Sequence, residues 1–125
     1  MSTKDKISKE FKSKTGEIFN IKNLVGCHTE GVIYQISCLK CKKQYIGQTG
    51  RRFHLRAMEH LRSIKAEDKT VGKHFSSACK AEHFKIQIIE KVFPNNEPFR
   101  LEREKYWIKT LHTIMPHGMN KNLNS

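Results

Sequence analysis

Two short runs of β-branched and aromatic residues lie close together and constrain this sequence more than any other feature. The first is Val-Ile-Tyr-Gln-Ile at 32–36, and the second is Gln-Tyr-Ile-Gly at 44–47. Runs of this kind are typical of β-strands, and a short connection joins neighbouring antiparallel strands. The connection here includes Cys-Leu-Lys-Cys-Lys-Lys at 38–43, which is longer than a tight turn. The sequence therefore predicts a β-hairpin with an enlarged loop that carries two cysteines.

The rest of the chain predicts three helices and one further strand. Apolar residues recur near helical spacing over 52–65, a short helix is expected over 70–78, and alternation from Phe84 predicts a strand that reaches residue 93. Glu97 and Pro98 open a last helix that should stop before Pro116. The expected fold class is α+β, with a small three-stranded antiparallel sheet flanked by helices. The apolar positions of the two long helices are Phe53, Leu55, Met58, Leu61 and Ile64, then Phe99, Leu101, Tyr106, Trp107, Ile108 and Leu111.

The charge of the chain predicts a polyanionic partner. Lysine and arginine number 24 against 12 acidic residues, and the basic residues recur along the whole sequence. The Lys- and Ser-rich segment 1–23 has few apolar residues and is expected to be a flexible arm, which leaves 24–125 as a single domain. No stretch approaches the ~20 apolar residues of a membrane span, and the N-terminus lacks the apolar core of a signal peptide. We therefore expect a soluble intracellular protein that binds nucleic acid.

The cysteine spacing favours a metal site. Cys38 and Cys41 are separated by two residues, as in many metal-binding loops, and the expected compartment is reducing. A redox pair is the alternative for this spacing. It ranks last because a cysteine pair of that type belongs in a βαβ unit, and the predicted hairpin does not provide one.

Four side chains should converge beside the hairpin. Tyr34 and Tyr45 are expected to point to one side of it, and Arg56 and His60 are four residues apart on the predicted helix, so they project from one helical face. Two phenols, a guanidinium and an imidazole suit phosphodiester chemistry. Such a reaction needs a group that accepts a proton, a permanent cation and usually a divalent metal.

The motif Gly-Val-Ile-Tyr at 31–34, followed by Tyr-Ile-Gly at 45–47, resembles the two signature halves of the GIY-YIG nuclease superfamily. The resemblance implies catalytic roles for Tyr34, Tyr45, Arg56 and His60. It also implies a Mg²⁺ or Mn²⁺ ligand at Glu104, with Glu102 as the alternative, and a catalytic role for the late asparagine, Asn120. The implied activity is metal-dependent DNA endonuclease cleavage.

Within the superfamily, the chain most resembles the endonuclease domain of Penelope-like retroelements. The resemblance rests on Cys38 and Cys41 between the signature halves, on Cys-His-Thr at 27–29, and on Trp107 followed by Pro-His-Gly-Met-Asn at 116–120. It implies target-DNA cleavage during integration, residence in the nucleus and a reverse-transcriptase domain of the same element as a partner. It also implies a structural Zn²⁺ site, here a tetrahedral set with His83 as reserve ligand: Cys38, Cys41, His74 and Cys79.

In the mechanism that this resemblance suggests, Tyr34 is the base and nearby cations lower its pKa. The candidate cations, which are also the expected DNA contacts, are Lys42, Lys43, Arg51 and Arg52. The competing hypothesis is a non-catalytic zinc-containing DNA-binding module. The sequence leaves open the oligomeric state, the target site and whether one DNA strand or both are cut.

Overall fold

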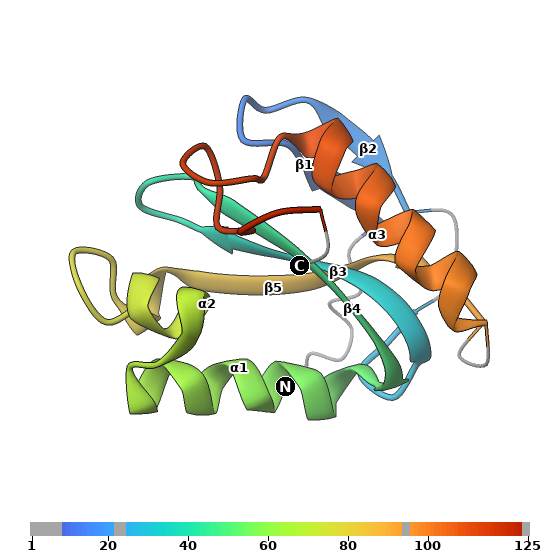
Figure 1. The fold of residues 1–125 in the computed structure, drawn as a ribbon, viewed down its shortest axis with the longest axis horizontal. Coiled ribbons are helices and arrows are strands. Elements are labelled where there is room, and N and C mark those ends of the chain that lie inside the picture. Colours follow the sequence, from blue (N-terminus) through green and yellow to red (C-terminus); the bar gives the residue numbers. More distant parts are fainter. Residues whose placement is uncertain (1–8, 22–24, 94–95, 124–125) are drawn as a thin grey trace.

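The protein is built around a three-stranded antiparallel sheet, which a computed structural model describes together with the rest of residues 9–21, 25–93 and 96–123 (Figure 1). The strand order is β4-β3-β5, so the first strand of the predicted hairpin is central. The architecture is α+β, as the sequence predicts. Two strands run longer than the apolar runs indicate, because β3 spans Glu30–Cys38 and β4 spans Gln44–Arg52. The third, β5, spans Phe84–Lys91 and ends two residues before the predicted position.

The central strand β3 is buried on both faces, and its alternating side chains belong to two separate hydrophobic clusters. Val32, Tyr34 and Ile36 lie in one cluster with residues of α1 (Phe53–Ala66) and α2 (Lys69–His74). Ile33 lies in the other cluster, with Ile108 and Leu111 of the last helix. Tyr34 therefore lies on the face of the sheet that α1 and α2 cover.

Helix α1 has the predicted bounds to within one residue, but its predicted apolar face is wrong in part. Phe53, His60 and Ile64 are buried, whereas Leu55, Met58 and Leu61 are exposed. The helix turns a polar residue, His60, toward the sheet because the imidazole finds a hydrogen-bond partner there, the phenol of Tyr34.

Helix α2 is held closely against α1. A Cβ atom added at Gly72 would lie 2.3 Å from the backbone oxygen of Ser63, so only glycine allows the two helices to approach to this distance. The helix is shorter than the predicted 70–78 and ends at His74, and a 3₁₀ turn at Ala81–His83 (η2) then leads into β5. The connection between α2 and η2 contains Cys79.

The opposite face of the sheet is covered by α3 (Glu97–Leu111) and by an N-terminal hairpin of β1 (Glu10–Lys12) and β2 (Ile18–Asn20) (Figure 1). The ring of Phe11 lies 5.2 Å from both the Phe19 and Trp107 rings, measured between centroids. The structure differs here from the expected flexible arm, because two aromatic residues in a basic segment find a partner on α3. The remaining residues of that arm, 1–8 and 22–23, lie outside the described part of the chain.

None of the helices in the described part of the chain combines the length and the apolar character needed to span a bilayer.

Candidate active site and metal centre

The phenol of Tyr34 is at the centre of a hydrogen-bonded cluster between β3 and α1. Its oxygen lies 2.7 Å from Nε2 of His60, and Nε of Arg56 donates to it at 3.0 Å. Tyr34 is 0% exposed. Because Arg56 uses a lone pair of the phenol oxygen, the phenol is free to donate its own hydrogen to His60. This arrangement requires the imidazole to be neutral, with its proton on Nδ1.

Gly47, the glycine of Tyr-Ile-Gly, makes room for this phenol. Tyr34 and Gly47 are cross-strand partners, and a Cβ atom added at Gly47 would lie 2.3 Å from the Tyr34 hydroxyl oxygen. The Tyr45 ring lies on the same face, 6.5 Å from the Tyr34 ring and 5.7 Å from that of His60. The predicted convergence of Tyr34, Tyr45, Arg56 and His60 is therefore observed in the structure.

The ionisation of the cluster differs from the expectation that cations lower the pKa of Tyr34. Burial raises the pKa of Tyr34 above its ordinary value, and Tyr45 raises it further, whereas Arg56 lowers it only in part. Burial also lowers the pKa of His60 to about 4, with Arg56 acting in the same direction. At neutral pH the cluster therefore holds a protonated phenol and a neutral imidazole, so Nε2 of His60 is the acceptor in its hydrogen bond with Tyr34.

Glu104 of α3 is a buried carboxylate that interacts electrostatically with this cluster. It is 6% exposed, it raises the pKa of both Tyr34 and Tyr45, and Arg56 in turn lowers its pKa. Burial outweighs Arg56 and raises the pKa of Glu104 to about 7. Glu102, the alternative metal ligand, is exposed on α3. A buried carboxylate beside two phenols and a guanidinium is suited to hold a divalent cation.

Glu59 joins the cluster, although the sequence reasoning missed it. Its carboxylate accepts two hydrogen bonds from Nη2 of Arg51, both 2.8 Å long, and a third from Nη1 of Arg56 at 3.0 Å. These bonds hold the Arg56 side chain with its Nε toward Tyr34. The spacing Arg56 to Glu59, three residues apart on a predicted helix, is the sequence signal that could have identified the pair.

The four expected DNA-contacting cations do not form one surface. Arg51 bonds Glu59, and Nε of Arg52 lies 3.8 Å from a Glu30 carboxylate oxygen. Lys42 lines a cavity under the N-terminal hairpin, on the other face of the sheet, whereas Lys43 lines a cavity beside His74. Lys43 and Arg51 therefore remain on the face of the sheet that carries Tyr34.

Asn120 makes structural contacts in this arrangement, and the catalytic role that the resemblance implies for it stays a prediction. It is 0% exposed, and its amide donates to the Ile46 carbonyl at 2.9 Å. Its side-chain oxygen accepts from the Ile46 backbone N–H at 2.8 Å and from the Thr113 hydroxyl at 2.7 Å. These bonds fix the C-terminal loop to β4 next to Tyr45.

We expect Asn120→Ala to lower the free energy of unfolding by about 2–4 kcal/mol, because the buried N–H and C=O of Ile46 lose their partner. Urea denaturation followed by circular dichroism measures this change. A loss below about 1 kcal/mol would show that water replaces the amide and that the buried bonds contribute little.

The raised pKa of Glu104 and the lowered pKa of His60 affect stability in opposite directions. The folded protein retains a proton on Glu104 that the unfolded chain releases. The contribution of Glu104 to the free energy of unfolding therefore falls as the pH rises from 4.5, the ordinary pKa of this carboxyl, to about 7. Over much of the same range, His60 is protonated in the unfolded chain but neutral in the folded protein. The contribution of His60 to the free energy of unfolding therefore rises as the pH rises from about 4 to 6.5, the ordinary pKa of histidine. The two effects should nearly cancel in the wild-type protein without a divalent ion at Glu104.

Single substitutions should therefore reveal opposite pH dependences. Between about pH 5 and 6.5, the stability of Glu104→Gln should rise with pH and that of His60→Gln should fall, each by at most about 1.4 kcal/mol per pH unit relative to wild type. Thermal unfolding of the three proteins at several pH values in this range measures the slopes. Parallel curves for all three would mean that neither group is shifted by burial.

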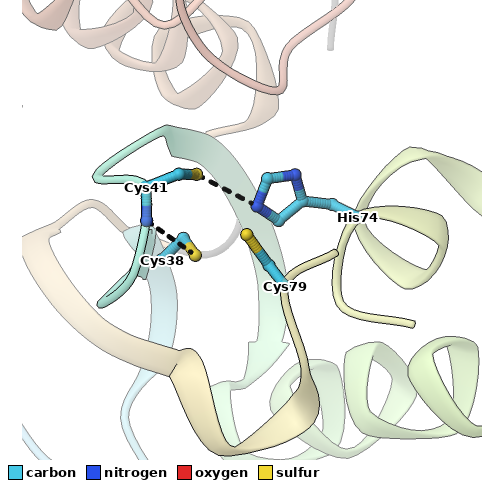
Figure 2. Close-up of side chains that lie close together, drawn as sticks. All are labelled: Cys38, Cys41, His74 and Cys79. Atoms are coloured by element: carbon cyan, nitrogen blue, oxygen red, sulfur yellow. Dashed lines mark hydrogen bonds between the residues drawn. The ribbon is translucent and has the colours of Figure 1, made fainter. Parts of the chain in front are cut away.

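A second cluster, of three cysteines and a histidine, lies at the far end of β3 and β4 (Figure 2). Cys38 ends β3 and Cys41 is in the following loop, while His74 ends α2 and Cys79 follows it. One ligand atom from each of these four residues lies within 4.8 Å of the others, and Sγ of Cys41 is 3.4 Å from Nε2 of His74. Such a set of soft and borderline donors can hold a metal ion tetrahedrally.

The thiols of this cluster differ in acidity. Burial alone would raise the pKa of Cys38, but backbone N–H groups of Cys41 and Lys40 and the neighbouring thiols lower it overall. Burial and the neighbouring cysteines raise the pKa of Cys79 to about 11. The reserve ligand His83 lies outside the cluster, because its Nδ1 accepts a hydrogen bond from the Lys80 backbone at 2.9 Å.

A three-stranded antiparallel sheet that presents two tyrosines to an arginine and a histidine of the adjoining helix defines a class of small α+β catalytic domains. Residues 30–120 match the model of the GIY-YIG catalytic domain, and the chain therefore belongs to the GIY-YIG family. The family signature is carried by the residues that build the cluster around Tyr34.

Two solved structures are similar to this chain. The catalytic domain of the homing endonuclease I-TevI has 22% sequence identity and a TM-score of 0.63, over 72% of this chain and 96% of that chain. A mutant of the catalytic domain of the intron endonuclease I-TevI has 22% identity and a TM-score of 0.65, over 78% and 97%. At this identity the likeness establishes the shared fold. No curated protein is significantly similar to the sequence.

Proposed function

We propose that residues 24–125 form a metal-dependent DNA endonuclease domain that hydrolyses phosphodiester bonds, cutting one strand at a time. The observation that carries this proposal is the Tyr34 phenol held between Arg56 and a neutral His60. A cavity of about 670 Å³ adjoins the cluster, and Tyr45, Arg56 and His60 line it. A phosphate in this cavity would meet a permanent cation and a proton acceptor together.

In the mechanism that we infer, Tyr34 takes a proton from the attacking water and passes its own proton to Nε2 of His60. This relay avoids a free phenolate, which the raised pKa of Tyr34 disfavours. The oxygen of the water forms a bond to phosphorus as the bond to the leaving oxygen breaks. Arg56 stabilises the charge that develops on the phosphate oxygens, and Tyr45 orients the phosphate.

Glu104 is the proposed ligand of the catalytic Mg²⁺ or Mn²⁺. When bound, this ion would supply Lewis-acid stabilisation of charge on the phosphate and leaving oxygens. The burial of Glu104 and its raised pKa support this assignment, because burial favours the neutral form of this carboxylate and a bound cation would reverse that preference. Asn120 would act by positioning β4.

The second metal that we propose is a structural Zn²⁺ held by Cys38, Cys41, His74 and Cys79. Three thiols and an imidazole suit zinc, and a four-ligand site leaves no open position for substrate. The ion would join the loop after β3 to the end of α2. Its role would be to stabilise the domain.

We further propose that the domain serves a Penelope-like retroelement by cutting target DNA during integration. Cys38 and Cys41 between the signature halves support this assignment, together with the proximity of His74 and Cys79 to them. On this proposal the domain acts in the nucleus, and a reverse-transcriptase domain of the same element is its partner.

The first test is incubation of purified protein with supercoiled plasmid, with Mg²⁺ or Mn²⁺ against EDTA, and with Glu104→Gln as the matched inactive variant. Nicked plasmid from wild type alone, and only with a divalent ion, would support the proposal. Binding without conversion under every metal condition would instead favour the non-catalytic DNA-binding module.

A further inference from the structure

Two cavities adjoin on the face of the sheet that carries Tyr34. The cavity of about 670 Å³ extends from Tyr45, Arg56 and His60 to Thr70 of α2. A cavity of about 430 Å³ is also lined by Thr70, and it extends to His74 and to the C-terminal loop residues around Pro116. Because Thr70 lines both, the two cavities are adjacent, and we infer that they form one groove from the catalytic cluster to the cluster of Cys38, Cys41, His74 and Cys79.

Besides Arg56, five basic side chains line the groove. Within the part of the chain that the structure describes, none of these side chains takes part in an ion pair. The two acidic residues that line it are Asp68 and Glu59, and Glu59 already bonds Arg51 and Arg56. The five groove cations are Arg62, Lys69 and Lys121 in the first cavity, then Lys43 and Lys73 in the second.

The two cations of the second cavity belong to the two segments that the proposed zinc ion would join. Lys43 follows Cys41 by two residues, and Lys73 immediately precedes His74. Both lysines line the second cavity together with His74. Figure 2 shows His74 with the three cysteines of its cluster. An ion that fixes Cys41 to His74 therefore also fixes the spacing of these two ammonium groups.

We propose that this groove is a phosphate-binding track for the DNA strand on one side of the cut. This proposal rests on the proposed nuclease function. Arg62, Lys69 and Lys121 contact the phosphates nearest the scissile bond, and Lys43 and Lys73 contact those beyond. The duplex then leaves the catalytic cluster along α2 toward the zinc site. The zinc site thus serves substrate binding as well as folding, because it builds the far end of the track.

The number of phosphate contacts can be measured from the salt dependence of binding. The logarithm of the binding constant falls linearly with the logarithm of salt concentration, with a slope of about −0.9 for each phosphate that a cation neutralises. A K43A/K73A variant should therefore have a slope less steep than that of wild type by about two. Fluorescence anisotropy with a labelled random-sequence duplex, in EDTA-free buffer with Ca²⁺, measures the slope.

Two matched variants make the result specific. K85A/K109A removes two exposed lysines that line neither cavity and should reduce the slope by less than the track variant does. K43R/K73R keeps both charges and should retain the wild-type slope, and a zinc content equal to that of wild type shows that the ligand cluster is intact in each variant. An unchanged slope in K43A/K73A, or an equal loss in K85A/K109A, would overturn the track.

Cleavage assays separate this proposal from the nuclease function itself. At saturating DNA, K43A/K73A should cut as fast as wild type, with KM raised at least severalfold, because it lacks only contacts remote from the reacting phosphate. If wild type binds DNA but never cuts it, the nuclease function fails. The salt dependence of binding would still show whether the phosphate-binding track exists.

Discussion

Cleavage by an Arg56→Ala variant is expected to be about a thousandfold slower than cleavage by wild type, because the variant loses the permanent cation at the reacting phosphate. Arg56 is the cation that contacts Tyr34, with Nε 3.0 Å from the phenol oxygen. Its removal would also raise the pKa of Tyr34 further, since Arg56 is the group that lowers it. The loss should be in kcat, measured with plasmid at saturating concentration.

Arg56→Lys should recover little of this rate. Arg56 donates to Tyr34 through Nε and to Glu59 through Nη1, which leaves Nη2 for a phosphate oxygen. A lysine ammonium is a point donor and cannot reproduce three directions of a planar fork. Lys65→Ala, an exposed residue in the last turn of the same helix, is the matched control and should cut at close to the wild-type rate. Full activity of Arg56→Ala would exclude a role for this guanidinium in the transition state.

The elements with strong local periodicity could be predicted from the sequence. The two runs at 32–36 and 44–47 identify β3 and β4, and the helical spacing at 52–65 identifies α1, because both patterns reflect burial on one face of a regular element. The order of the site residues along these elements then fixed their convergence. Tyr34 faces α1, and Arg56 and His60 are one turn apart on it.

The buried polar residues could not be predicted in the same way. His60 occupies an inward position that periodicity assigns to an apolar residue, and Leu55 and Met58 are exposed instead. Whether an imidazole is buried depends on a hydrogen-bond partner on another element, here Tyr34, and a helical pattern does not contain that information. For the same reason, the sequence did not predict the hydrogen bonds of Asn120, whose partner Ile46 is on β4.

The N-terminal hairpin was missed because its stabilising contacts are remote in sequence. Composition predicts a flexible arm there, since lysine and serine dominate. Phe11 is buried and Phe19 is partly buried, and both rings pack against Trp107, which lies on a helix near the other end of the chain. Local composition cannot show that two isolated phenylalanines will share one aromatic partner.

Removal of the proposed Zn²⁺ is expected to lower the free energy of unfolding by about 4 kcal/mol or more, the contribution of a ligand present at about a thousandfold above its Kd. For a domain of this size the corresponding fall in Tm is ~15 °C. The cluster joins the end of β3 to the end of α2, so without an ion the buried thiols of Cys38 and Cys79 lose the partner that their geometry requires. Thermal unfolding before and after a high-affinity chelator, with zinc added back, measures the change.

Cys38→Ser and Cys27→Ser distinguish a metal effect from a general effect of losing a cysteine. Cys38 belongs to the cluster, whereas Cys27 is an exposed thiol outside it. Cys38→Ser should therefore have the low Tm of the chelated protein and show no further response to chelator, while Cys27→Ser should behave as wild type. His83→Ala should also behave as wild type, because the His83 ring bonds the Lys80 backbone rather than the cluster. If Cys38→Ser and Cys27→Ser unfolded at the same temperature and neither responded to chelator, the four residues of the cluster would be ordinary core packing. The rigidity of the loop after β3 would then have to come from its hydrogen bonds alone.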